Sequence, residues 1–278
     1  MCRHLARLGP VRTLAEQIVE PPHGLYRQAW EPRRQRHGTV NADGFGIGWY
    51  PPDGGPEPAR YRRAVPIWAD PNLPDLARTL RSGAVLAAVR DATPGACQGE
   101  GACAPFRTGR WLFSHNGSVD DWTRLPADTG EPVSAEELLG LEAHCDSALL
   151  WALVARRLGA GEPPGAALAA VVRAVAAVRP GSRLNLLLTD GRTVTAVRWG
   201  DTLCHRTTSG DAPSTVVASE PLDDGDWQDV PDRSLLHATP GTAEITPLTP
   251  GPRAAVPAAA TAAAAPSPYE VAERTFPS

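Results

Sequence analysis

The order of apolar and polar positions predicts a chain in which strands lie before and after a central pair of helices. Short alternating or continuously apolar runs, bounded by Gly, Pro or Asp, are typical of strands. Such runs occupy residues 2–8, 43–50, a segment near Tyr61, 84–90, 110–115, 202–207 and 214–219. Two further strand patterns, within LNLLLTDGRTVTAVRW, predict a hairpin that turns at Asp190-Gly191.

Helical patterns are marked by start and stop signals. Thr13 and Glu16 have the spacing of a capping box, which predicts a short helix that ends before Pro21-Pro22. Residues 74–81 form another short helical pattern, and apolar helices are predicted over 146–158 and 165–178. Strands on both sides of a helix pair predict an α+β fold built as a layered sandwich.

The composition changes after Pro247. The segment PLTPGPRAAVPAAATAAAAPSP has too few large apolar residues to pack into a core. The sequence therefore predicts one domain over residues 2–247 and a flexible Ala/Pro-rich tail over 248–278.

Composition and charge exclude several classes of function. All 27 basic residues are arginine and the net charge is −4, so a Schiff-base lysine is excluded and a nucleic-acid partner is not expected. No apolar run is long enough to span a bilayer, and MCRHLARLG lacks the hydrophobic stretch of a signal peptide. We therefore expect a cytoplasmic protein with no membrane partner. The five cysteines form no CxxC pair, so no metal site is expected. Cys97 and Cys103 are expected to be free thiols, with a pair under oxidation as the alternative.

Cys2 is the strongest candidate for a chemical role. Removal of Met1 would leave a thiol nucleophile and a free α-amine on the same residue, and a small second side chain permits that removal. The amine of an N-terminal residue titrates at about 7.7–8.0, so it can act as a base towards its own side chain near neutral pH. The alternative is a cysteine that only happens to follow Met1.

Two segments carry groups that acyl transfer requires. Asn116-Gly117 combines a side-chain amide with a backbone N–H, and both can converge on one oxyanion. The alternative is a simple turn after the strand at 110–115. Arg90 and Thr93 follow a buried strand, and a guanidinium near a hydroxyl suits a substrate carboxylate. The alternative for the guanidinium is an ion pair with Asp91 or another structural carboxylate.

Asp146 opens an apolar helix, where a carboxylate caps the helix or faces a substrate ammonium. The preceding pair, His144-Cys145, is not expected to act as a dyad, because adjacent side chains point apart on a helix or a strand.

Together and in this order, these residues resemble the class II glutamine amidotransferases of the N-terminal-nucleophile hydrolase superfamily. The matching elements are Cys2, Arg90 with Thr93, His115-Asn116-Gly117 and Asp146. A second set of segments resembles the γ-glutamyl hercynylcysteine sulfoxide hydrolases of bacterial ergothioneine biosynthesis. These are MCRHLA, PRRQRHGTVNADGFGIGW, VLAAVRDAT, SHNGSVD, RLNLLLTDG, WGDTL and ASEP.

The resemblance implies a four-layer αββα sandwich and hydrolysis of a γ-glutamyl amide through a Cys2 thioester, releasing glutamate and hercynylcysteine sulfoxide. It implies that Asn116 and Gly117 hold the oxyanion, and that Arg90, Thr93, His115 and Asp146 bind the small-molecule γ-glutamyl substrate. It implies no metal or organic cofactor. A glutaminase subunit that supplies ammonia to a separate synthetase and a non-catalytic γ-glutamyl-binding protein are the alternatives. The oligomeric state is not predicted.

Overall fold

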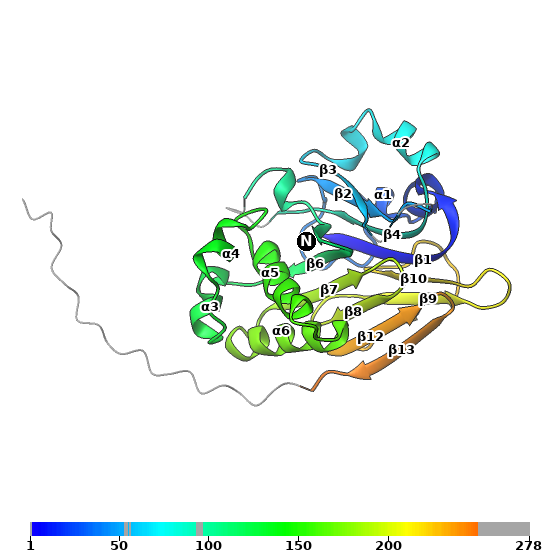
Figure 1. Ribbon diagram of the computed structural model, residues 1–278. Helices are drawn as coiled ribbons and strands as arrows, with labels where there is room; N and C mark the ends of the chain where they lie inside the picture. The colour runs from blue at the N-terminus through cyan, green and yellow to red at the C-terminus, as the bar shows by residue number, and fades with distance from the viewer. Residues whose placement is uncertain (1, 53–54, 56, 93–96, 250–278) are drawn as a thin grey trace, which may run out of the picture.

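Two antiparallel sheets stacked face to face form the centre of the protein (Figure 1). The computed structural model describes residues 2–52, 55, 57–92 and 97–249. In these residues the first sheet has the strand order β11 (Gln228–Asp229), β9 (Cys204–Thr208), β10 (Ser214–Ala218), β1 (Arg3–Thr13), β4 (Arg81–Val89), β2 (Phe45–Trp49), β3 (Ala59–Arg63). The second has the order β13 (Thr242–Pro247), β12 (Ser234–Thr239), β8 (Val194–Arg198), β7 (Arg183–Thr189), β6 (Trp111–Ser118), β5 (Phe106–Thr108).

Helices cover the outer face of each sheet. The long helices α5 (Asp146–Gly159) and α6 (Pro164–Val178) pack on the second sheet. A π-helical turn (Ala15–Val19), α1 (Leu25–Gln28) and α2 (Leu73–Thr79) pack on the first. The remaining short helices are η2 (Ile67–Ala69), η3 (Glu100–Ala102), η4 (Trp122–Arg124), α3 (Leu125–Asp128) and α4 (Ala135–Leu139). The predicted four-layer αββα sandwich is confirmed.

Period-two alternation explains why β1 is buried on both faces. Leu5 contributes to the core under the first sheet's helices, whereas Ala6 and Leu8 contribute to the core between the sheets. Successive side chains of a strand point to opposite faces of the sheet. A central strand in a four-layer fold therefore needs apolar residues on both of its faces. The predicted strand at 2–8 is therefore confirmed, and pairing with β4 extends it to Thr13.

The capping-box spacing is confirmed by reciprocal hydrogen bonds. The Glu16 backbone N–H donates to Thr13 Oγ1 (3.2 Å), and the Thr13 backbone N–H donates to Glu16 Oε2 (2.7 Å). The helices predicted over 146–158 and 165–178 and the hairpin at Asp190-Gly191 are also present.

The turn considered at Asn116-Gly117 is not formed. Both residues lie within β6, opposite Asn185 and Leu184 of β7. A local turn signal is overridden here because the neighbouring strand supplies a continuous ladder partner.

Strands β12 and β13 have no counterpart among the sequence predictions. They extend the second sheet, and Leu248 beyond them is buried, with its N–H donating to the Arg233 carbonyl (2.7 Å). Residues 250–278 of the predicted tail lie outside the described residues.

The buried His205 of β9 is expected to make folding sensitive to acid. Neither ring nitrogen has a hydrogen-bond partner, and burial lowers the pKa of the imidazole below its ordinary value. The unfolded chain therefore binds a proton below about pH 6.5 that the folded chain resists, so stability falls as the pH falls through that value. We expect His205→Leu to gain stability relative to wild type between pH 7.5 and 5.5, by at most about 1.4 kcal/mol per pH unit.

Urea unfolding of both proteins at the two pH values measures this effect. Replacement of the exposed His144 by Gln is the matched control. An advantage of His205→Leu that is the same at both pH values would contradict the assignment.

Candidate active site

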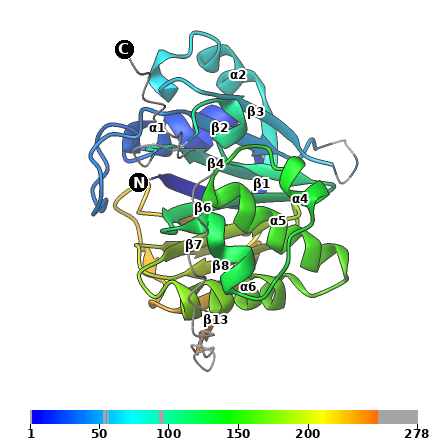
Figure 2. The same ribbon diagram turned by 90° about the vertical axis from the view of Figure 1, so that its left-hand side faces the viewer.

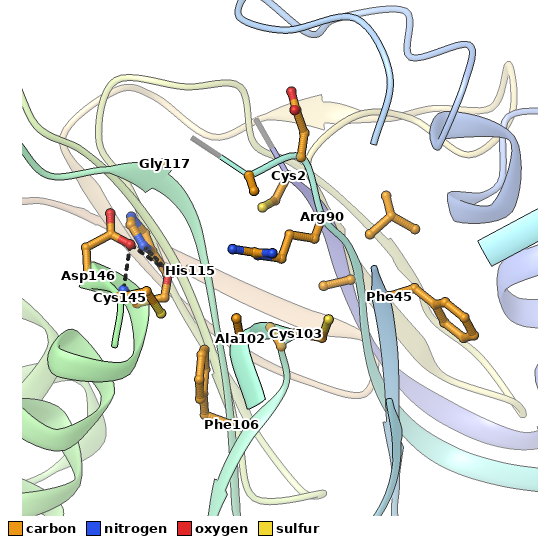
Figure 3. Close-up of a pocket in the computed structure, with 16 residues that line it drawn as sticks. Cys2, Phe45, Arg90, Ala102, Cys103, Phe106, His115, Gly117, Cys145 and Asp146 are labelled. Atoms are coloured by element: carbon orange, nitrogen blue, oxygen red, sulfur yellow. Dashed lines mark hydrogen bonds between the residues drawn. The ribbon is translucent and has the colours of Figure 1, made fainter. Parts of the chain in front are cut away.

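Antiparallel pairing of the central strands β1 and β4 places Cys2, at the start of β1, beside Arg90, at the end of β4. Arg3 lies opposite Val89, so Cys2 precedes this pair and Arg90 follows it. A pocket opens at these strand ends, and β6 and the first turn of α5 form its opposite wall (Figure 3). Five of the predicted site residues line it: Cys2, Arg90, His115, Gly117 and Asp146. Thr93 lies outside the described residues.

The environment of Cys2 favours a protonated thiol. Burial raises its pKa above the ordinary value, while a hydrogen bond from the Asp91 backbone N–H and the charge of Arg90 act in the opposite direction. A thiol held protonated near neutral pH requires a base before it can act as a nucleophile.

Arg90 presents a buried positive charge that no carboxylate of the described residues neutralises. Its guanidinium donates to two backbone carbonyls, those of Cys97 (2.9 Å) and Asp43 (3.4 Å). Within the described residues it forms no ion pair, so the alternative of pairing with Asp91 is not realised. A desolvated cation is costly unless an anion joins it, so this side chain suits the carboxylate of a ligand.

Asp146 is the first helical residue of α5, and the cap position is held by Cys145. The predicted N-cap role of Asp146 is therefore wrong by one residue. Its Oδ2 accepts from the Val119 backbone N–H (3.0 Å), and its Oδ1 accepts from the Ser147 backbone N–H (2.7 Å). These bonds fix the orientation of the carboxylate at the pocket wall.

His115 is held in one tautomer by two neighbours. Its Nε2 is 3.0 Å from the carbonyl oxygen of Arg183, which can only accept, so Nε2 carries the proton. Nδ1 then accepts from the hydroxyl of Ser147, 2.9 Å away on α5. The ring therefore joins β6, β7 and α5 around the pocket.

Gly117 allows β7 to approach β6 closely. A Cβ at this position would overlap the carbonyl oxygen of Arg183 and lie 2.7 Å from His115 Nε2. We expect Gly117→Ala to destabilise the fold by about 1–3 kcal/mol. We also expect it to lower turnover of the γ-glutamyl amide that the sequence resemblance implies, by roughly 10²-fold or more, because the N–H at this position moves. Thermal unfolding and glutamate release measure the two effects.

Gly181→Ala is the matched control, since a Cβ there meets no heavy atom within 4 Å. Wild-type activity and stability in Gly117→Ala would show that the close approach of the strands is not required.

Asn116 is not among the residues that line the pocket, and its side chain faces the opposite side of β6 from His115 and Gly117. Its fully buried side chain lies between the sheets, where Nδ2 donates to Ser219 Oγ (3.2 Å) and Oδ1 has no partner. The same Ser219 oxygen accepts from the His4 backbone N–H (3.0 Å). Ser219 thus connects the Asn116 amide to the start of β1, two residues from Cys2.

Ser147, Cys103 and Cys145 are among the pocket residues that sequence reasoning did not place there. Burial raises the pKa of both thiols to about 11, so both stay protonated near neutral pH. Cys97 and Cys103 are free, as expected. His144 packs its ring against Trp122 at 4.6 Å between centroids, away from any dyad with Cys145.

The described part of the chain contains no cluster of three or more His, Cys, Asp or Glu side chains arranged to hold a metal ion. None of its described helices has the length and apolar character needed to cross a bilayer.

A family model for class II glutamine amidotransferases matches residues 25–207. The chain belongs to this family. The fold agrees: the chain superimposes with a TM-score of 0.64 on a class II glutamine amidotransferase domain protein from Silicibacter pomeroyi. That protein is 25% identical, and the match covers 90% of this chain and 100% of that one.

Two curated relatives of this amidotransferase carry the name γ-glutamyl-hercynylcysteine sulfoxide hydrolase. The protein of Mycolicibacterium smegmatis is 42% identical over 89% of this chain and 100% of its own length. The protein of Mycobacterium tuberculosis H37Rv is 40% identical over 89% of this chain and 97% of its own length. A probable glutamine amidotransferase of Saccharomyces cerevisiae is 27% identical, with 89% of this chain and 84% of that protein covered.

Proposed function

We propose that this class II amidotransferase hydrolyses the γ-glutamyl amide of γ-L-glutamyl-hercynylcysteine sulfoxide, releasing L-glutamate and hercynylcysteine sulfoxide. Similarity to the two mycobacterial hydrolases along nearly their whole length supports this substrate. The observation that carries the γ-glutamyl specificity is the pair formed by Arg90 and Asp146. Both face the pocket that contains the Cys2 sulfur, and neither has an ion-pair partner among the described residues (Figure 3).

Arg90 and Asp146 suit the two charges of a glutamyl group. The guanidinium binds the α-carboxylate, and the carboxylate of Asp146 binds the α-ammonium. The side chain of glutamate then extends its δ-carbonyl towards Cys2. Thr93 contributes its hydroxyl to the α-carboxylate in this proposal, and the ring of His115 keeps the wall of the pocket in place.

The nucleophile acts after removal of Met1. The α-amine of Cys2 takes the thiol proton, and the thiolate attacks the δ-carbonyl carbon. The resulting tetrahedral oxyanion receives hydrogen bonds from the Gly117 N–H and the Asn116 amide. When it collapses, the C–N bond breaks, the departing amine takes the proton, and a γ-glutamyl thioester remains on Cys2. The α-amine of Cys2 then takes a proton from water, which attacks the thioester. Glutamate is released, and the proton returns to the Cys2 sulfur.

A rotation of the Asn116 amide by 180° makes its Nδ2 available for this role. In the present orientation Ser219 Oγ accepts from two donors, and the amide oxygen has no partner. After rotation, the Ser219 hydroxyl donates to the amide oxygen while still accepting from the His4 N–H, so the Asn116 Nδ2 is released. The donors and acceptors of the Asn116 amide, the Ser219 hydroxyl and the His4 N–H therefore favour this orientation during catalysis.

Turnover of three compounds tests the proposal: the sulfoxide conjugate, its non-oxidised thioether and glutamine. We expect the sulfoxide to be hydrolysed with the highest kcat/KM, with glutamate and hercynylcysteine sulfoxide formed in equal amounts. Glutamate release from glutamine alone, increased by a separate synthetase, would instead identify a glutaminase subunit.

A further inference from the structure

A buried hydrogen bond joins the two sheets close to the nucleophile. His4 of β1 and Ser114 of β6 are both fully buried, and His4 Nδ1 lies 3.0 Å from Ser114 Oγ. Figure 1 and Figure 2 both show the start of β1, drawn in dark blue, beside β6 of the second sheet. The bond therefore helps to set the separation of the two sheets at this place.

His4 and Ser114 stand two residues from the groups that carry the proposed chemistry. Side chains two positions apart on a strand point to the same face and lie about 6–7 Å apart along it. Cys2 immediately precedes β1, two residues before His4, and Asn116 follows Ser114 by two residues on β6. The bond between the ring and the hydroxyl therefore lies one alternation step behind the gap between the Cys2 sulfur and the Asn116 amide.

Ser219 provides a second connection between the same strands. The His4 backbone N–H and the Asn116 amide donate to Ser219 Oγ, at 3.0 and 3.2 Å, and the Ser219 N–H donates to the His4 carbonyl (2.9 Å). This connection persists when the Asn116 amide rotates, because the Ser219 hydroxyl then donates to the amide oxygen. His4 is thus linked to β6 twice, through its ring and through its backbone.

The ring of His4 is placed to hold the strands and not to meet the substrate. It does not line the pocket, and its Nε2 has no hydrogen-bond partner among the described residues. Burial lowers the pKa of the ring well below its ordinary value, so the ring is neutral near neutral pH. The bond to Ser114 is therefore the polar contact through which the ring can act on the site.

We propose that His4 is a positioning residue, whose bond to Ser114 sets the distance between the nucleophilic sulfur and the amide that binds the oxyanion. This inference rests on the proposed function, in which both groups act on one carbonyl. A displacement of reacting groups by about 1 Å can lower a rate by about 10²-fold. A bond one alternation step away can therefore control turnover without touching the substrate.

Variants of His4 and Ser114 separate this role from general support of the fold. His4→Asn is the conservative change, since the Asn amide has a polar atom at the position of Nδ1 and can bond to Ser114. His4→Leu fills the space without a polar atom, and Ser114→Ala removes the bond from the other strand. His205→Leu is the matched control. It replaces another buried ring of the first sheet that lies outside the pocket and has no hydrogen-bond partner among the described residues.

The test measures kcat for the sulfoxide conjugate, the inhibition constant of glutamate and the melting temperature. We expect His4→Leu and Ser114→Ala each to lower kcat roughly 10- to 100-fold. The inhibition constant of glutamate should stay within about threefold of wild type, because Arg90 and Asp146 bind the glutamyl group. His4→Asn should keep kcat within about threefold of wild type, and His205→Leu should not change it. The double variant should lose no more than the more impaired single variant, since both changes remove one bond.

Equal losses of kcat in His4→Asn and His4→Leu would overturn the proposal, as would losses that multiply in the double variant. Wild-type kcat in Ser114→Ala would also overturn it, and this variant tests the bond even if His4→Leu does not fold. A wild type that hydrolyses glutamine but not the conjugate would instead overturn the proposed substrate, and kcat for glutamine then provides the same comparison. Failure with both compounds would overturn the proposed function.

Discussion

Replacement of Cys2 by Ala is expected to lower hydrolysis of γ-glutamyl-hercynylcysteine sulfoxide by roughly 10⁴-fold or more. The thioester cannot form without the sulfur, and a water molecule in its place is a much weaker nucleophile although the α-amine of residue 2 remains. Cys2→Ser keeps an oxygen nucleophile but exchanges a thiol for a far weaker acid, so it should retain only a small part of the activity. Glutamate release under single-turnover conditions measures the loss.

Cys204→Ser is the matched control, because Cys204 is a buried thiol of β9 that does not line the pocket. It should keep the wild-type rate. Intact mass of the purified protein should also lack Met1. Full activity in Cys2→Ala, or full activity with Met1 retained, would contradict the mechanism.

Replacement of Arg90 by Met is expected to separate activity from stability. We expect kcat/KM to fall roughly 10²- to 10³-fold, mainly through KM, because the α-carboxylate loses its cationic partner. The free energy of unfolding should fall by no more than about 1 kcal/mol, since the substitution removes a buried charge that no described carboxylate neutralises. Arg90→Lys keeps the charge without the fork and should lie between wild type and Arg90→Met.

Glutamate provides a second readout for Arg90. A ligand that binds only the folded state raises the melting temperature, so glutamate should stabilise wild type but not Arg90→Met. Arg192→Gln, which changes an exposed arginine between β7 and β8, should respond to glutamate as wild type does. A large loss of stability in Arg90→Met without ligand would show that the guanidinium mainly supports the fold.

The turn considered at Asn116-Gly117 and the N-cap predicted at Asp146 were wrong for the same physical reason. Asn116-Gly117 has the composition of a turn, yet β7 continues the ladder across both residues. Asp146 has the composition of an N-cap, yet the backbone of Cys145 adopts the extended conformation of the cap. In both places the backbone of a neighbouring residue or strand determined the local conformation. Residue type alone does not indicate how that neighbouring backbone is arranged.

The residues of the site differ in how far the sequence predicted them. Cys2 was visible from its position alone, and Arg90 from its place after a buried strand. The sequence did not indicate Ser147, because its role depends on a contact between α5 and β6, where its hydroxyl lies 2.9 Å from the ring of His115.

The sequence by itself determined the strands, the two long helices and the chemical groups available, because side-chain periodicity and residue type are local properties. Only the tertiary structure decided which of these groups meet. The antiparallel register of β1 with β4 places Cys2 beside Arg90, and the packing of α5 on β6 adds Asp146. Register and layer packing depend on contacts between segments far apart along the chain, and a local pattern leaves many such pairings possible.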